Sequence, residues 1–188
     1  MFSTREPEGK YFLADIIGAS VRDSSETVVG TIADFTILLG DKFPKLPQVV
    51  VKSSDGERRV LVRRDQFKQF SPDSFSLTVP FSELPAMENV PEQVLLKNIW
   101  DKQIVDISDA RVVRVNDLQI AELKGDWRLF GVDISTRGLL RRLGWEKWLY
   151  PVLSKLRIPV SNDIIAWDFV EGIPMNLSPL KLTVSSQK

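Results

Sequence analysis

The chain has 188 residues, of which 43% are hydrophobic and 27% are charged, a composition typical of a folded soluble protein. Its 25 basic and 25 acidic side chains balance, which argues against a dedicated nucleic-acid-binding protein, DNA-binding proteins included, because such proteins carry a basic excess. Histidine and cysteine are both absent. Their absence excludes disulfides, histidine-activated nucleophiles and zinc sites built from nitrogen and sulfur ligands.

The first half of the chain is predicted to form short strands. Residues 27–39 are rich in β-branched side chains and predict a strand. Residues 46–52 predict a second strand, and Asp55-Gly56 predicts a tight hairpin that returns over 59–63. Polar and apolar side chains alternate over 75–79, which predicts a half-buried strand at the end of this unit.

A proline-rich segment separates this half from the next. Three prolines lie within 80–91, where they interrupt both helices and central strands. We therefore predict a linker over 81–93 between two units, 11–80 and 94–173, that fold separately. Residues 174–188 are expected to be a C-terminal tail or a truncated linker.

The two predicted units resemble each other in sequence. Residues 11–52 align without a gap onto 94–135, an offset of 83 residues. Identical residues fall on apolar positions and on aspartates that flank turns, which indicates a tandem repeat. In the second unit, strands are predicted over 111–122, 127–135 and 163–169. Short strands in units of about 75 residues favour small closed β-barrels, because closure removes exposed strand edges.

The second unit contains a longer segment that the first unit lacks. Its apolar side chains over 137–156 follow helical spacing. Gly144 and Pro151 are expected to interrupt it, so two short helices are predicted. Leu139, Leu140 and Leu143 are expected to anchor this helical insertion to the second barrel.

Several runs in the second unit resemble the PRC-barrel family, namely 96–106, 112–118 and 129–144. That family includes the cytoplasmic part of the photosynthetic reaction-centre H subunit and the C-terminal domain of a ribosome maturation factor. Gly131–Ile134 followed by Gly138–Gly144 is more specifically similar to the tandem PRC-barrel region of MgtE-type magnesium-transporter-like proteins. The resemblance implies an all-β fold of two tandem small PRC-type β-barrels, the second with a short helical insertion.

The resemblance also implies a function. It suggests a non-enzymatic cytoplasmic adaptor or regulatory module, the N-terminal part of a magnesium-transporter-like protein. Such a module acts through contacts with a protein partner or with downstream domains of the same polypeptide. The alternative is an RNA- or ribosome-associated binding module. No apolar run is long enough to cross a bilayer and no signal peptide is evident, so no membrane insertion is expected, although peripheral contact stays open.

No catalytic residue, cofactor site or metal site is expected. The aspartates that recur in both units are candidate Mg²⁺ ligands, and they are Asp23, Asp34, Asp106 and Asp117. No dense cluster of acids or EF-hand spacing accompanies them, and aspartate commonly accepts hydrogen bonds from turn amides. We therefore interpret them as structural residues.

The helical insertion supplies the candidate interaction site. Its residues are Arg137, Arg141, Arg142, Trp145, Trp148 and Tyr150. Aromatic side chains with arginine are typical of protein interfaces, and Trp and Tyr also favour membrane interfaces. The alternative is that the insertion only covers the second barrel. At Gly30 the first unit has a glycine where the second has Val113, so the local structure is expected to differ there.

Overall fold

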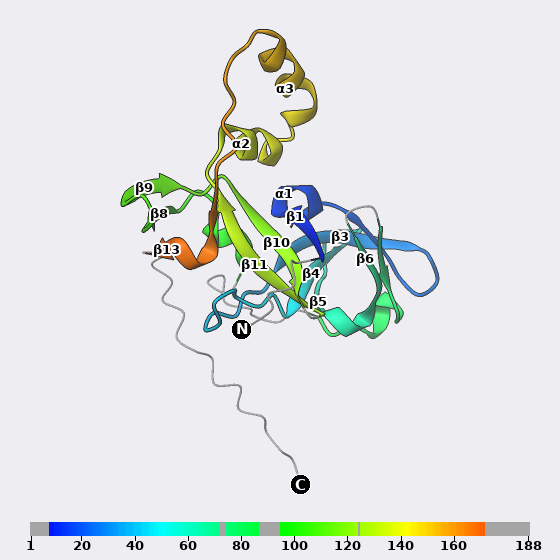
Figure 1. The fold of residues 1–188 in the computed structure, drawn as a ribbon. Helices are drawn as coiled ribbons and strands as arrows, with labels where there is room; N and C mark the ends of the chain where they lie inside the picture. Colours follow the sequence, from blue (N-terminus) through cyan, green and yellow to red (C-terminus); the bar gives the residue numbers. More distant parts are fainter. Residues whose placement is uncertain (1–7, 72–73, 87–94, 124, 172–188) are drawn as a thin grey trace.

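The structure is a computed structural model, and it describes residues 8–71, 74–86, 95–123 and 125–171. Within these ranges the strands form three sheets, accompanied by a few short helices (Figure 1). The β-rich class expected from the sequence is therefore confirmed. None of the three sheets closes on itself in this part of the chain, so two tandem PRC-type barrels stay a prediction.

The first sheet is built from the first half of the chain and has six strands in the order β5-β4-β3-β2-β7-β6. Its strands are β2 (Ser20–Arg22), β3 (Val28–Phe35), β4 (Gln48–Ser53), β5 (Arg59–Arg63), β6 (Phe67–Ser71) and β7 (Ser74–Leu77). The predicted hairpin joins β4 to β5: Gly56 has a φ of 80°, and the Asp55 carboxylate accepts a 3.0 Å hydrogen bond from the Glu57 amide. Asp-Gly supplies this turn because glycine adopts positive φ without strain.

Two smaller sheets contain the strands of the second half together with β1 from the start of the chain. The four-stranded sheet has the order β1-β10-β11-β12, and the three-stranded sheet has the order β13-β8-β9. The strands are β1 (Glu8–Phe12), β8 (Gln103–Asp106), β9 (Arg111–Arg114), β10 (Asp117–Leu123), β11 (Asp126–Asp133), β12 (Ile164–Ala166) and β13 (Val170–Glu171). The strand predicted over 111–122 is thus two strands, β9 and β10, in different sheets.

Short helices connect and flank these strands. They are α1 (Leu13–Ile16), η1 (Arg64–Gln66), η2 (Phe81–Glu83), η4 (Leu96–Ile99), α2 (Thr136–Arg142), α3 (Glu146–Lys155) and η5 (Trp167–Phe169). The two short helices predicted in the insertion are present as α2 and α3. Gly144, at a φ of 73°, separates them, whereas Pro151 lies inside α3 and does not interrupt it.

Each half of the chain places a segment against the other half. β1 lies at the start of the first half but pairs antiparallel with β10 of the second, with Phe12 opposite Gln119. In the reverse direction, Leu95 forms an antiparallel bridge with Thr36 at the end of the first sheet. The two contacts are related by the 83-residue offset that aligns the sequence halves.

Two buried aspartates fix this reciprocal arrangement. The Asp117 Oδ1 atom accepts a hydrogen bond of 3.2 Å from the backbone amide of Ala14. The Asp34 Oδ1 atom accepts one of 3.1 Å from the amide of Lys97. Asp117 is fully buried and Asp34 is 5% exposed, so the carboxylate that accepts each hydrogen bond is shielded from water. The start of each half is thereby bound to a strand of the other.

One hydrophobic core extends across both halves. The rings of Phe70 in β6 and Trp127 in β11 lie 4.5 Å apart between centroids. The described part of the predicted linker contributes as well, because Leu84 is only 2% exposed and Ala86 bridges to Val60. Residues 87–93 of the linker and the predicted tail 174–188 lie outside the described residues. The division into units 11–80 and 94–173 stays a prediction, but the core is shared.

The difference between Gly30 and Val113 has a steric explanation. β4 passes so close to β3 that a Cβ atom on Gly30 would lie 2.2 Å from the carbonyl oxygen of Lys52. Val113 lies in β9, which within the described residues pairs only with β8. The segment that corresponds to β4 is the end of β11, and after Asp133 the chain leaves the sheet and enters α2. No described strand therefore lies against Val113 as β4 lies against Gly30, so a side chain fits there.

The shared core predicts a single cooperative unfolding transition, contrary to the separate folding expected from the linker. Fragments 1–85 and 90–188, expressed alone, should each lack fixed tertiary structure, because each exposes core side chains and loses its partner's segment. Near-ultraviolet circular dichroism of each fragment and of the mixture checks this. Two independently folded fragments with cooperative melts would contradict it, whereas recovery of the native spectrum on mixing would support it.

Candidate functional site

The insertion begins at a tightly constrained junction with β11. The Asp133 carboxylate accepts a 2.8 Å hydrogen bond from the Ser135 amide. The Ser135 hydroxyl then caps α2 by accepting a hydrogen bond of 2.9 Å from the Gly138 amide. A Cβ atom on Gly138 would lie 2.6 Å from the Asp133 carboxylate. Glycine at this position therefore allows α2 to approach the buried acid.

Arg141 is the buried centre of the insertion, with 6% of its side chain exposed. One guanidinium nitrogen lies 2.9 Å from Asp117 Oδ2 and 3.2 Å from Asp133 Oδ2. Nε lies 3.3 Å from a carboxylate oxygen of Glu146 and 3.9 Å from one of Asp15. The partners come from β10, β11, α3 and α1, so this one side chain joins the insertion to both halves.

An aromatic contact completes the surroundings of Arg141. Its guanidinium carbon lies 3.4 Å from the centroid of the Phe12 ring at the end of β1. Arginine is suited to this position because its planar group stacks on a ring while its edge binds carboxylates. We therefore assign Arg141 to the anchoring of the insertion and not to its contact surface.

Burial changes the protonation of the acids in this cluster. Loss of hydration raises the pKa of Asp117 to about 6, although hydrogen bonds from the Leu118 amide and from Arg141 oppose the shift. Burial likewise raises the pKa of Asp15 above its ordinary value, and the charge of Arg141 opposes that shift. The cluster thus combines one buried cation with two acids, Asp117 and Asp15, whose pKa values are raised.

This burial predicts a specific pH dependence for Asp117. The folded pKa of about 6 lies above the ordinary 3.8, so folding is favoured by the protonated acid. That contribution is complete below the unfolded pKa and is lost as the pH rises through the folded one. The free energy of unfolding of the wild type, measured relative to Asp117→Asn, should therefore decrease between about pH 4 and pH 7.

Urea unfolding at several pH values measures this difference. The exposed variant Asp163→Asn serves as the control, and its difference from the wild type should change much less over the same range. A difference for Asp117→Asn that stays constant or grows with pH would show that Asp117 is ionised throughout.

The other two arginines of the predicted site are also engaged. Arg137 Nε lies 2.6 Å from Glu146 Oε1, and its guanidinium carbon lies 4.8 Å from the centroid of the Tyr150 ring. Arg142 pairs with Asp101 at 3.0 Å. Each predicted arginine therefore has an acidic partner. The Tyr150 ring packs against Arg137, within the insertion.

Unlike the arginines, the two tryptophans of the predicted site are exposed and have no charged partner within the described residues. Trp145 is 47% exposed and Trp148 is 61% exposed, and their rings lie 6.1 Å apart. α3 contains no buried residue at all. We define the apolar tip as the exposed apolar side chains of this segment, which are Leu143, Trp145, Trp148, Val152, Leu156 and Ile158.

The expected leucine anchors are only partly correct. Leu140 is 7% exposed and Leu139 is half-buried, as expected for side chains that face the body. Leu143 is 46% exposed, so its prediction as an anchor is wrong. The reason is that α2 ends at Arg142 and the chain turns at Gly144, so the buried face of the helix stops before Leu143.

The recurring aspartates have structural roles in the described residues. Asp23 accepts hydrogen bonds from the Ser25 and Thr27 amides, and Asp106 accepts one from the Ser108 amide. The Ser108 hydroxyl, together with Arg111, holds the pKa of Asp106 below its ordinary value. No group of three or more acids is placed to bind a metal ion in this part of the chain. The expectation that no specific metal site exists stays a prediction.

A shallow hollow lies between the β4–β5 hairpin and η2. Val28, Ser53, Asp55 and Arg58 contribute to its wall, together with Phe81. Arg58 lies 5.7 Å from the Phe81 ring centroid and donates a hydrogen bond to the Leu84 carbonyl, so it is already engaged. Hydrogen bonds from Ser53 and Glu57 lower the pKa of Asp55. A lowered pKa favours the ionised form and does not point to a general acid.

Comparisons with known proteins add no assignment. No model of a protein family matches the chain, and no curated protein matches it. The resemblance to PRC-barrels therefore stays a prediction from the sequence. Among the described residues, no helix has the length and apolar character needed to span a bilayer.

Proposed function

We propose that the protein is a non-enzymatic docking module, an adaptor or regulatory unit whose contact surface is the apolar tip. The observation that carries this proposal is that α3 has no buried residue, although it bears Trp148 and other large apolar side chains. Clusters of exposed apolar side chains are unfavourable in water and mark interaction surfaces. A helix that only covered a barrel would bury these side chains.

The base of the insertion supports the same function. Arg141 and Leu140 fix α2 to the body, while α3 projects from it. In Figure 1, α3 lies at the outer end of the insertion, away from the three sheets. A surface that is held in place before binding loses less conformational freedom on association.

The PRC-barrel resemblance is consistent with this role. It implies an adaptor at the N-terminal part of a magnesium-transporter-like protein, with a protein partner or downstream domains as the contact. The RNA- or ribosome-associated alternative receives less support, because RNA binding needs a continuous basic face. Arg137, Arg141 and Arg142 are each paired with an acid, so the described insertion offers only the separated cations Lys147, Lys155 and Arg157, which do not form such a face.

The proposal predicts that the tip contributes little to folding. Trp148→Ala should change the free energy of unfolding by less than about 0.5 kcal/mol, because the ring is mostly in water. Leu140→Ala should lower it by about 2–4 kcal/mol, because it leaves a cavity in a buried position. Urea unfolding of both variants measures the contrast. Equal destabilisation would show that the tryptophan is part of the core and would contradict the proposal.

Docking itself can be tested because the chain contains no cysteine. A single cysteine introduced by Val152→Cys in the tip should react rapidly with a maleimide in the purified protein. In the native cell the same cysteine should be protected, whereas Glu57→Cys in the distant β4–β5 hairpin should react equally in both settings. Equal reactivity of Val152→Cys in the cell and in the purified protein would contradict docking through the tip.

A further inference from the structure

We propose that the apolar tip docks to the headgroup region of a membrane that contains anionic lipids. This inference rests on the proposed function, because it names the surface that the tip contacts. It concerns peripheral binding, in which α3 lies in the interface and the β-rich body stays in water. Three features of the tip support it: the face that its apolar side chains share, the sign of its unpaired charges, and its position on the molecule.

The exposed large apolar side chains of α3 and of the two residues that flank it share one face. Trp148, Val152 and Leu156 follow one another at intervals of four residues, and Trp145 lies one turn before Trp148. Residues at this spacing project from the same side of a helix. An amphipathic helix with Trp and aliphatic residues on one face inserts that face into the boundary between headgroups and acyl chains. Tryptophan is enriched at that depth in membrane proteins.

The charges around this face are positive. Lys147, Lys155 and Arg157 are exposed, and none of them has an ion-pair partner within the described residues. Between positions 143 and 162 the sequence holds a single acid, Glu146. Its carboxylate is already bound by Arg137 and Arg141, so the unpaired charges of the tip all have one sign. Basic side chains near an anionic bilayer are attracted by its negative surface potential.

The distribution of these cations favours a lipid surface over a protein groove. Lys147 and Lys155 lie near opposite ends of α3, and Arg157 follows the helix, so the charges are spread along the whole tip. A bilayer offers negative charge over its entire area, so spread cations all find partners there. A protein groove would need matching acids at three separate places.

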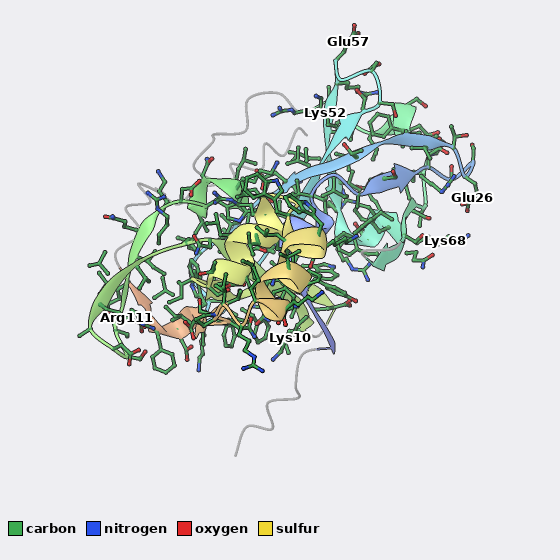
Figure 2. All side chains as sticks on the ribbon, turned by 90° about the horizontal axis from the view of Figure 1, so that it is seen from above. Lys10, Glu26, Lys52, Glu57, Lys68 and Arg111 are labelled. Atoms are coloured by element: carbon green, nitrogen blue, oxygen red, sulfur yellow. The ribbon has the colours of Figure 1, made fainter. Side chains whose placement is uncertain are left out.

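The position of α3 allows a flat surface to approach it. Figure 1 shows α3 as the part of the insertion farthest from the sheets. Figure 2, viewed from above, shows α2 and α3 in front of the middle of the molecule, with Glu57 and Arg111 near its opposite ends. A bilayer that meets the molecule from this side contacts α3 before it contacts the sheets.

Co-sedimentation of the full chain with lipid vesicles tests the inference. We expect binding to phosphatidylcholine vesicles that contain phosphatidylglycerol, weak binding to phosphatidylcholine alone, and loss of binding at high salt. Lys155→Gln should weaken binding to the anionic vesicles about fivefold, which corresponds to the contribution of one cation. Trp148→Ala should remove most of the binding. Both positions are exposed, so the variants should fold normally.

Matched variants outside the tip serve as controls. Lys68→Gln removes a similarly exposed lysine in β6, and Val112→Ala removes an exposed apolar side chain in β9, which is 65% exposed. Both should bind vesicles like the wild type. Equal binding to neutral and anionic vesicles, or equal losses in the control variants, would overturn the inference.

The outcome also separates this inference from the proposed function. No vesicle binding, with Val152→Cys still protected in the cell, would overturn the lipid inference and indicate a protein partner at the tip. No vesicle binding and no protection would overturn both proposals. Protection of Val152→Cys from maleimide by anionic vesicles, and not by neutral ones, would support both.

Discussion

The carboxylate of Asp117 connects the three parts of this protein. Its Oδ1 atom accepts hydrogen bonds from the amides of Leu118 and Ala14, and its Oδ2 atom binds Arg141. These partners belong to the second half, the first half and the helical insertion. A buried carboxylate is unfavourable unless its oxygens are bound, so the three contacts depend on one another. Removing Arg141 would leave Oδ2 of this buried carboxylate without its hydrogen-bond donor.

Comparison with Asp34 shows what the insertion adds. Asp34 occupies the matching position of the first half and accepts hydrogen bonds from the Phe35 and Lys97 amides. Burial raises its pKa as it does that of Asp117. No guanidinium is bound to Asp34 in the described residues, because the first half continues from β4 into a hairpin. Both halves thus contain a buried aspartate that binds an amide of the other half. Arg141 adds the helical insertion to this arrangement at Asp117.

Local patterns in the sequence predicted the local parts of this structure. The β-branched runs, the Asp55-Gly56 turn and the helical spacing of the insertion each depend on neighbouring residues, and each is present. The pairing of β1 with β10 joins residues more than a hundred positions apart, and no local pattern specifies it. The proline-rich segment is likewise a local pattern. It indicates where regular secondary structure stops, near 80–91, but it carries no information about the contacts that join the two halves.

The candidate site shows the same limit at the level of single residues. Arg137, Arg141 and Arg142 look equivalent in the sequence, yet only Arg141 is buried. A usable signal was Gly138, which lies three positions before Arg141 and therefore on the same face of α2. A glycine within a helix is unfavourable unless close approach requires it, so it marks the face that packs against Asp133. The two tryptophans, named in the sequence as candidate interaction residues, are exposed, but how far α3 stands from the body has no local signal.

The ion pairs of Glu146 connect the anchoring of the insertion with the properties of the tip. A helix as short as α3 is marginally stable alone, so contacts at its start matter. Glu146 lies in its first turn, where a negative charge is favoured by the helix dipole, and it binds both Arg137 and Arg141. The same contacts neutralise the single acid between positions 143 and 162. Holding α3 in place therefore also leaves the exposed charges of the tip uniformly positive, and no separate set of residues is needed for each role.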